Sequence, residues 1–197
     1  GFAAGYSNTT GARITAIGNG ALYENTTGND NTAVGWNTLD ANTTGINNIA
    51  MGRDALGANT SGGYNVALGM EALKTNTTAS SNTAVGYQAA YSNTTGATNT
   101  ALGQWSLYDN TSGSNNVAIG RDALQNNTTA VRNTAVGYQA GYSVATGSYN
   151  VLIGDEAGKD LTVYSSTFVG SAAGENVTSG YGNSLFGRKA ANKLTSG

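Results

Sequence analysis

The stretch that decides the fold runs from Asn82 to Thr98 and reads NTAVGYQAAYSNTTGAT. The stretch before it, from Asn65 to Ser81, reads NVALGMEALKTNTTASS, and the one after it, from Asn99 to Asn115, reads NTALGQWSLYDNTSGSN. The same pattern continues almost to both ends of the chain. A short fixed period of this kind is typical of proteins in which each repeat stacks on the next.

A glycine marks the repeat, because it recurs every 17 residues from Gly1 to Gly154 and then appears as Gly170 and Gly187. Seventeen residues are too few for two helices and a turn, and Gly, Asn and Thr are poor helix formers. We therefore predict an all-β fold: a parallel β-solenoid in which each 17-residue coil returns to its starting point.

The repeat divides the chain into two regions of one solenoid. Residues 1–153 hold the regular coils, and residues 154–197 are expected to form less regular coils, because one step there is 16 residues long and an Asn-Thr corner is lost. We expect a bulged or widened coil near Val163 to Thr167. The chain begins at a marker glycine inside a repeat, so we expect it to be a fragment or a processed product.

A short strand is predicted just before each glycine, as in Asn82-Thr83-Ala84-Val85. Alternation places Thr83 and Val85 on one face and Ala84 on the other. We assign the β-branched and large apolar columns to the interior, with the leucine after each glycine closing the other side of the core. An outward column that stays small predicts close packing against another chain. The predicted oligomer interface is Ala16, Ala33, Ala50, Ala67, Ala84, Ala101, Ala118, Ala135, Leu152, Phe168 and Leu185.

The core of one such solenoid is thin. Each coil buries about three apolar side chains, worth a few kcal/mol at roughly 25 cal/mol per Å². Ordering each of its residues costs on the order of 1–2 kcal/mol. A second interface shared between chains would offset this cost, and three thin prisms can each bury one edge around an axis. We therefore expect a parallel homotrimer.

The composition excludes several functions. The chain has 197 residues with 29 Gly, no Pro, Cys or His, and a net charge of −2. This charge gives no footprint for nucleic acid, and no stretch is apolar enough to insert into a membrane. The absence of His and Cys excludes common catalytic triads and most transition-metal sites. We predict no enzyme, no cofactor and no metal site.

One pair of carboxylates, Asp54 and Glu71, has the spacing of an acid–base site. Asp54 and Glu71 hold equivalent positions in neighbouring coils, about 4.8 Å apart along the stack, close to the spacing of a retaining glycosidase. A solvated surface column flanked by Arg53 is the favoured interpretation, and the same holds for Asp155-Glu156 as a cation site.

Aromatic residues suggest a binding surface. Trp36, Tyr87 and Tyr138 follow the marker glycine directly and Trp105 stands one position further. Exposed aromatic faces on a rigid surface suit sugar stacking, so we predict these four as ligand-binding residues, with packing between coils as the alternative. For a second aromatic column such packing is the favoured role: Tyr6, Tyr23, Tyr91, Tyr108 and Tyr142.

Each repeat also carries an Asn-Thr-Thr or Asn-Thr-Ser corner. Asn tolerates left-handed turns, and stacked Asn side chains can bond along a column. The same corners match the N-glycosylation sequence, which leaves glycosylation as an alternative. The corner asparagines are Asn8, Asn25, Asn42, Asn59, Asn76, Asn93, Asn110 and Asn127.

The run Asn82-Thr-Ala-Val-Gly-Tyr-Gln-Ala89, repeated at Asn133 to Ala140, resembles the repeats of phage tail-fibre and tail-spike proteins. It is also similar to the head repeats of trimeric autotransporter adhesins of the YadA type. The resemblance implies a left-handed parallel β-roll, assembled as a trimer, that serves in attachment.

We therefore expect an extracellular attachment fibre or adhesin segment on a virion tail fibre or bacterial surface, which binds host-surface glycans or another surface receptor. The alternative is an ice-binding solenoid that uses the corner threonines, and a thermal-hysteresis assay separates the two. The corner threonines are Thr9, Thr26, Thr43, Thr60, Thr77, Thr94, Thr111 and Thr128.

Overall fold

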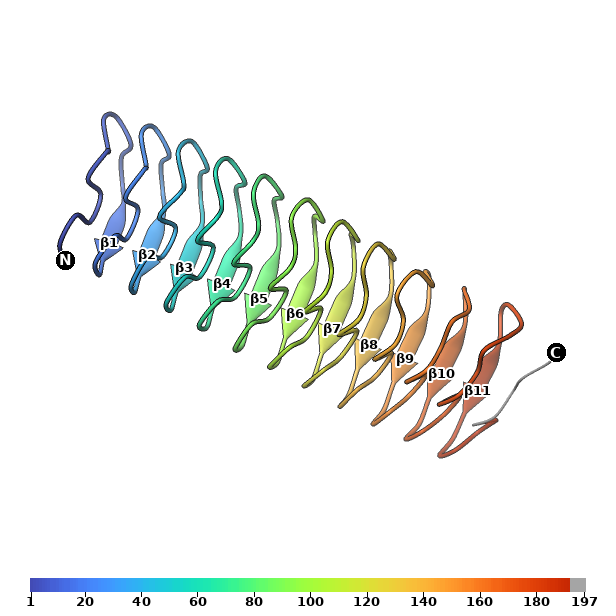
Figure 1. Ribbon diagram of the computed structural model, residues 1–197. Coiled ribbons are helices and arrows are strands. Elements are labelled where there is room, and N and C mark those ends of the chain that lie inside the picture. The colour runs from blue at the N-terminus through green and yellow to red at the C-terminus, as the bar shows by residue number, and fades with distance from the viewer. Residues whose placement is uncertain (192–197) are drawn as a thin grey trace.

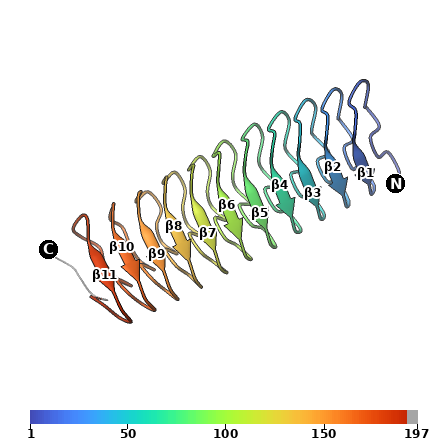
Figure 2. The same ribbon diagram turned by 180° about the vertical axis from the view of Figure 1, so that it is seen from behind.

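The computed structural model describes residues 1–191 and contains one elongated solenoid whose coils follow one another in chain order (Figure 1). Its strands form a single parallel sheet in the order β1 to β11, and the view from behind shows the same row (Figure 2). The strands are β1 (Thr15–Ile17), β2 (Thr32–Val34), β3 (Ile49–Met51), β4 (Val66–Leu68), β5 (Thr83–Val85), β6 (Thr100–Leu102), β7 (Val117–Ile119), β8 (Thr134–Val136), β9 (Val151–Ile153), β10 (Thr167–Val169) and β11 (Ser184–Phe186). The predicted all-β parallel solenoid is confirmed.

Neighbouring coils are joined all around their perimeter. In the sheet, each residue pairs with its equivalent one repeat later, as Ala84 pairs with Ala101. Outside the three-residue strands the backbone bonds continue along the axis, for example from Leu73 N–H to the Ala89 carbonyl at 3.0 Å. An insertion or deletion at any point must therefore be absorbed within its own coil.

The marker glycine is required for two reasons. Gly69 has φ 139°, a conformation that residues with a Cβ rarely adopt. A Cβ on Gly69 would also lie 2.4 Å from the carbonyl oxygen of Gly86 in the next coil. The close approach of successive coils at this point thus excludes any side chain.

The predicted orientation of the strands is wrong. Alternation holds, but Ala84 and Ala101 are 0% exposed within their own chain, whereas Met51 and Leu102 are 46% and 44% exposed. The leucine column across the coil, including Leu56 and Leu73 at 0% exposure, is buried as predicted and leaves room only for a small residue opposite.

The predicted interface through the alanine column is therefore also wrong, because these side chains already pack inside the coil. Ala33, Ala50, Ala67, Ala84, Ala101, Ala118, Ala135, Leu152 and Phe168 are fully buried, and Ala16 and Leu185 are partly buried against the same core. Small size at this position marks close packing within one chain.

The C-terminal coils use a different core of the same width. Leu152 and Phe168 replace alanine in β9 and β10, and glycine replaces leucine on the opposite side. A Cβ on Gly158 would lie 2.7 Å from Leu152 Cδ2, and one on Gly174 would lie 2.4 Å from Phe168 Cε2. The bulky side chain has moved to the other side of the coil, and glycine opposite makes space for it.

The 16-residue step shortens one corner. Asn150 Nδ2 donates to the Val163 carbonyl at 3.1 Å across 13 residues, where the preceding coil spans 14 from Asn133 to Gly147. Pairing of β10 with β9 resumes with Thr167 opposite Val151. The coil is shortened there, in contrast to the bulge or widening expected near Val163 to Thr167. Residues 192–197 of the expected C-terminal region lie outside the described residues.

The corner asparagines form a buried amide ladder, as their column predicted. Asn76 Nδ2 donates to Asn59 Oδ1 at 2.8 Å and to the Ala79 carbonyl at 3.0 Å, and Asn93 Nδ2 donates to Asn76 Oδ1 at 3.0 Å. Asn59, Asn76 and Asn93 are all 0% exposed. A glycan on any of these three nitrogens would break the ladder, so the folded coil is incompatible with glycosylation there.

A second ladder, which the sequence analysis did not identify, uses the asparagine before each strand. Asn65 Oδ1 accepts from the backbone N–H of Asn82 at 3.0 Å, and Asn82 Nδ2 donates to the Gly96 carbonyl at 2.9 Å. This asparagine recurs in the sequence directly before every strand from β2 to β9, which is the signal that could have identified it.

We predict that Asn76→Ala lowers the free energy of unfolding by about 2–4 kcal/mol, because it leaves buried Asn59 Oδ1 without its donor and removes the ladder acceptor of Asn93 Nδ2. Urea unfolding followed by circular dichroism measures the change. Thr78→Ala, at the exposed position of the same corner, is the control and should change stability by less than about 0.5 kcal/mol. Equal stability of the two variants would contradict the structural role of the ladder.

Candidate functional site

The four predicted ligand-binding aromatics do not form one cluster. Tyr87 and Trp105 contact each other edge to face, with ring centroids 6.1 Å apart. Tyr138 is covered by the Arg121 guanidinium at 4.8 Å from the ring centroid. Trp36 is 51% exposed in an earlier coil. Of the four, Tyr87 and Trp105 lie together.

A groove of about 440 Å³ runs along one flank of the solenoid beside Trp105. Its side chains come from two columns, the second and the fifth residue after the marker glycine, so it lies on a different side from the outward face of the strands. We call it the flank groove. It is lined by Gln88, Trp105, Tyr108, Asp122, Gln125, Gln139 and Tyr142. Trp105 is the one lining residue among the four predicted aromatics.

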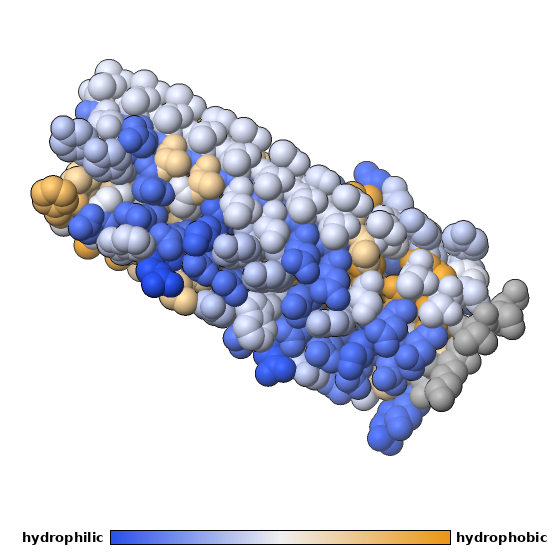
Figure 3. Space-filling model, viewed as in Figure 1, coloured by the Kyte–Doolittle hydropathy of each residue, from blue (hydrophilic) through white to orange (hydrophobic). Residues whose placement is uncertain are grey.

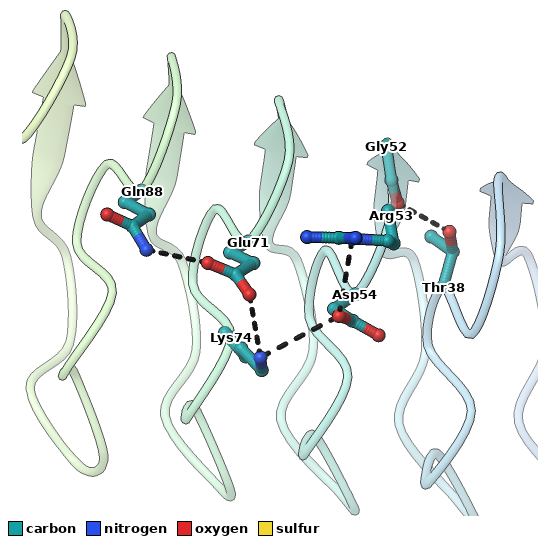
Figure 4. Close-up of polar contacts among 7 residues, drawn as sticks. All are labelled: Thr38, Gly52, Arg53, Asp54, Glu71, Lys74 and Gln88. Atoms are coloured by element: carbon teal, nitrogen blue, oxygen red, sulfur yellow. Dashed lines mark hydrogen bonds and ion pairs between the residues drawn. The ribbon is translucent and has the colours of Figure 1, made fainter.

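The Trp105 ring is held by a chain of polar contacts. Its Nε1 donates to Gln88 Oε1 at 2.9 Å, and Gln88 Nε2 donates to Glu71 Oε2 at 2.6 Å. Glu71 Oε1 in turn accepts from Lys74 Nζ at 2.8 Å (Figure 4). Because each group fixes the next, the indole has a defined orientation at the groove.

The same contacts decide the role of the Asp54 and Glu71 pair. Lys74 Nζ lies 3.6 Å from Asp54 Oδ2 and 2.8 Å from Glu71 Oε1, and Arg53 lies beside Asp54 (Figure 4). Hydrogen bonds from Lys74 and Gln88 lower the pKa of Glu71. A general acid needs a raised pKa, so this pair behaves as a salt-bridged surface cluster.

The other acidic pair, Asp155-Glu156, has one carboxylate engaged in an ion pair. Lys159 Nζ bonds to Glu156 Oε1 at 2.8 Å, which already neutralises that carboxylate. Within residues 1–191 there is no group of three or more His, Cys, Asp and Glu side chains that could hold a metal ion.

Asp122 is the most unusual polar residue of the flank groove. Asp122 is only 4% exposed, and its Oδ2 lies 3.1 Å from Arg121 Nε. Its other carboxylate oxygen, Oδ1, is buried and has no hydrogen-bond partner. A buried oxygen without a partner carries a desolvation cost. The burial of Asp122 could not be predicted from the sequence.

The tyrosine column packs between coils, as predicted, and its interruption opens the groove. Tyr91 and Tyr108 stack with ring centroids 5.2 Å apart, as do Tyr6 and Tyr23. Gln125 stands between Tyr108 and Tyr142 in the same column. The smaller glutamine leaves a gap in the stack, and this gap is part of the flank groove.

A second candidate surface is the outward face of the strands, which we call the strand face. Its two columns hold only Thr, Ser and apolar residues, and none of them is buried within the chain. They are Thr15, Thr32, Ile49, Val66, Thr83, Thr100, Val117, Thr134, Val151, Thr167 and Ser184, with Ile17, Val34, Met51, Leu68, Val85, Leu102, Ile119, Val136, Ile153, Val169 and Phe186. By contrast, the side of the molecule seen in Figure 3 is mostly hydrophilic or neutral, with hydrophobic colour near the two ends.

The corner threonines, on which the ice-binding alternative depends, have engaged hydroxyl groups. Thr43 Oγ1 donates to the Thr60 carbonyl at 3.0 Å, and Thr60 Oγ1 donates to the Thr77 carbonyl at 3.1 Å. The following Thr or Ser of each corner is exposed and forms a single outward column. The corner therefore presents one column of free hydroxyl groups.

No protein-family model, curated protein or solved structure matches the chain. Within residues 1–191 no helix is long and apolar enough to cross a membrane. The functional argument therefore rests on the strand face and the flank groove.

Burial and ion pairing shift two aspartate pKa values in opposite directions. Burial raises the pKa of Asp109 above its ordinary 3.8, whereas a hydrogen bond from Arg13 lowers the pKa of Asp30. When the folded-state pKa is raised, the unfolded chain loses the Asp109 proton first as pH rises. Deprotonation then favours the unfolded state, so the Asp109 carboxylate destabilises the fold above pH 3.8. Asp30 has the opposite effect, which is lost as pH falls through its folded pKa.

We predict that Asp109→Asn raises the thermal unfolding midpoint at pH 7 and that its advantage disappears well below pH 3.8, where the parent carboxyl is protonated in both states. Asp30→Asn is the matched control and should lower the midpoint at pH 7. Calorimetry across pH 2.5 to 7 measures both, and a constant difference between Asp109→Asn and the parent at all pH values would contradict the burial of this carboxyl.

Proposed function

We propose that this chain is a segment of an extracellular attachment fibre, on a virion tail fibre or a bacterial surface, in which three parallel copies pack through their strand faces and display glycan-binding flanks. The observation that carries the proposal is the exposed apolar strand face. Contiguous exposed apolar surface along a rigid element marks an interaction site.

The strand face has the size of a specific interface. Two columns of eleven residues give 22 side chains, within the roughly 20–30 residues a side of a stable protein–protein interface. Ile17 and Phe186, near the two ends of the face, are 57% and 69% exposed, and Leu102, near its centre, is 44% exposed. The second column of the face is thus apolar along its full length, beside a first column of Thr, Ser, Val and Ile. Such a face suits a partner of equal length, which another copy supplies.

The width of the face favours three copies. Residues two apart in a strand lie about 6.6 Å apart, so the two columns make a narrow strip. Three narrow strips around an axis enclose one continuous core and leave every flank and corner exposed. This arrangement also agrees with the trimer implied by the resemblance to tail-fibre and adhesin repeats.

The remaining surface suits attachment. A rod held by backbone bonds around its perimeter is rigid, and rigid aromatic and amide side chains bind with little loss of conformational freedom. The flank groove offers these groups on a side away from the strand face. Host-surface glycans are therefore the proposed ligand class.

The test of assembly is sedimentation of the parent and three variants. We predict that the parent is a trimer and that Leu102→Glu weakens assembly on the order of 100-fold or more, because three carboxylates would meet in an apolar core. Circular dichroism should show that this variant keeps its fold. Thr129→Glu, at an exposed corner, should sediment as the parent does.

A substitution at Ala101, the residue next to Leu102, should act on the fold of the single chain instead of on assembly. Ala101→Glu should disrupt the coil itself, because Ala101 is 0% exposed in the single chain, and should lose the β-sheet signal. A parent that stays monomeric at high concentration, or a Leu102→Glu variant that assembles as the parent does, would overturn the proposal.

The second candidate function is ice binding, through the strand face instead of the corner threonines. A flat sheet surface with two regular columns and repeated threonine, as at Thr83 and Thr100, is better suited to ice than the single corner column. Thermal hysteresis by a monomeric parent that Thr100→Lys abolishes would support this function. A trimer without hysteresis would exclude it.

A further inference from the structure

We propose that the flank groove is a binding site for a short neutral oligosaccharide that lies along the solenoid axis, with Trp105 as its stacking platform. This inference rests on the proposed function and deepens it, because it assigns the glycan to one place and one chemical class. The juxtaposition that carries it is an oriented indole and two unengaged amides that line one groove together with Asp122, whose buried Oδ1 has no partner.

The platform is preorganised. Trp105 is held through Gln88, Glu71 and Lys74, so its ring need not be ordered when a ligand binds. A sugar ring carries an apolar face of C–H groups that packs on an aromatic ring, with hydroxyl groups around its rim. Tyr108 and Tyr142 line the same groove in the fifth-residue column and add further aromatic surface.

The rim hydroxyls find partners of the right kind. The side chains of Gln125 and Gln139 make no hydrogen bond to the described residues 1–191, so their amides can both donate to and accept from a ligand. Asp122 Oδ1 lacks a partner in the unliganded groove. Because Oδ1 is buried, a ligand hydroxyl can donate to it only after neighbouring side chains move, and the new hydrogen bond would then remove the cost of its burial.

The charge of the lining selects a neutral ligand. Asp122 is the one charged residue among the groove-lining side chains, and Arg121, which contacts its Oδ2, is stacked on Tyr138. Because Asp122 is paired with Arg121, the lining offers no unpaired cation to bind sialic or uronic acids and no unpaired anion to bind an amino sugar. Neutral hexoses and N-acetylhexosamines are the remaining class.

The length of the groove favours an oligosaccharide. The lining residues of the second-residue column, from Gln88 to Gln139, come from four consecutive coils. At about 4.8 Å per coil they span roughly 14 Å, which exceeds a single sugar ring. The columns run along the axis, so a linear glycan would follow the stack.

The chain has two tryptophans, which gives a direct assay. In the Trp36→Phe variant, Trp105 is the one remaining indole, and its fluorescence reports on the groove. Titration would use neutral probes (cellohexaose, maltohexaose, mannohexaose, lacto-N-tetraose and N-acetylchitohexaose) and one anionic probe, 6′-sialyllactose. We expect a saturable change with at least one neutral probe and none with the anionic probe.

The variants Trp105→Ala and Asp122→Ala should each weaken binding of that probe tenfold or more by isothermal titration, with circular dichroism as the parent's. If Trp105→Ala fails to fold, Gln139→Ala provides the same test at the other end of the groove. Tyr64→Ala, at an exposed aromatic residue outside the groove, is the control and should bind as the parent does.

The outcomes separate this inference from the proposed function. Absence of any response to the neutral probes, or equal binding of 6′-sialyllactose, overturns the inference. Glycan binding that survives Trp105→Ala and Asp122→Ala overturns it as well, while a trimer with glycan binding elsewhere leaves the fibre proposal in place. A monomeric parent that binds a neutral probe in the groove would overturn the fibre and keep the site.

Discussion

The constraint on which the structure depends is the vertical register between coils. Every residue must lie above its equivalent in the next coil, because backbone hydrogen bonds join the coils in the strands and in the turns alike. The asparagine ladders add side-chain bonds in the same direction. This register explains the constant 17-residue step and the glycine at each point where two coils approach most closely.

The same register determines which columns of residues are restricted in size from coil to coil and which columns can change freely. Inward columns hold apolar residues whose sizes compensate in the C-terminal coils, as where Phe168 packs opposite Gly174. The flank columns carry no such restriction, so Gln88, Trp105 and Asp122 succeed one another at equivalent positions. A binding groove can thus arise by substitution on a flank without any change in the fold.

Periodicity allowed the sequence to predict the solenoid, the buried leucine column and the amide ladder at the corners. It could not decide which face of the strand is inside, because alternation is equally satisfied by either orientation of Thr83-Ala84-Val85. The width of the coil decides it: with Leu73 buried on the opposite side, only alanine fits. In the proposed trimer, the exposed Val and Leu residues take the role that the sequence argument assigned to alanine.

The candidate site was predicted only in part for a related reason. The aromatic columns were visible, and Trp105 was among the predicted ligand-binding residues. The groove, however, depends on side chains from two columns and four coils, and on the burial of Asp122. Neither the distance between columns nor the burial of one carboxylate follows from spacing along the chain.

Small-angle X-ray scattering of the unmodified protein tests the central claim, that the strand faces pack side by side, most directly. The account predicts a particle of about 59 kDa, three times the 19.8 kDa of one chain, whose length remains that of a single rod. Eleven strands at about 4.8 Å per coil make that length roughly 50 Å. A particle with the mass of one chain, or one whose length grows in proportion to its mass through end-to-end stacking, would contradict the account.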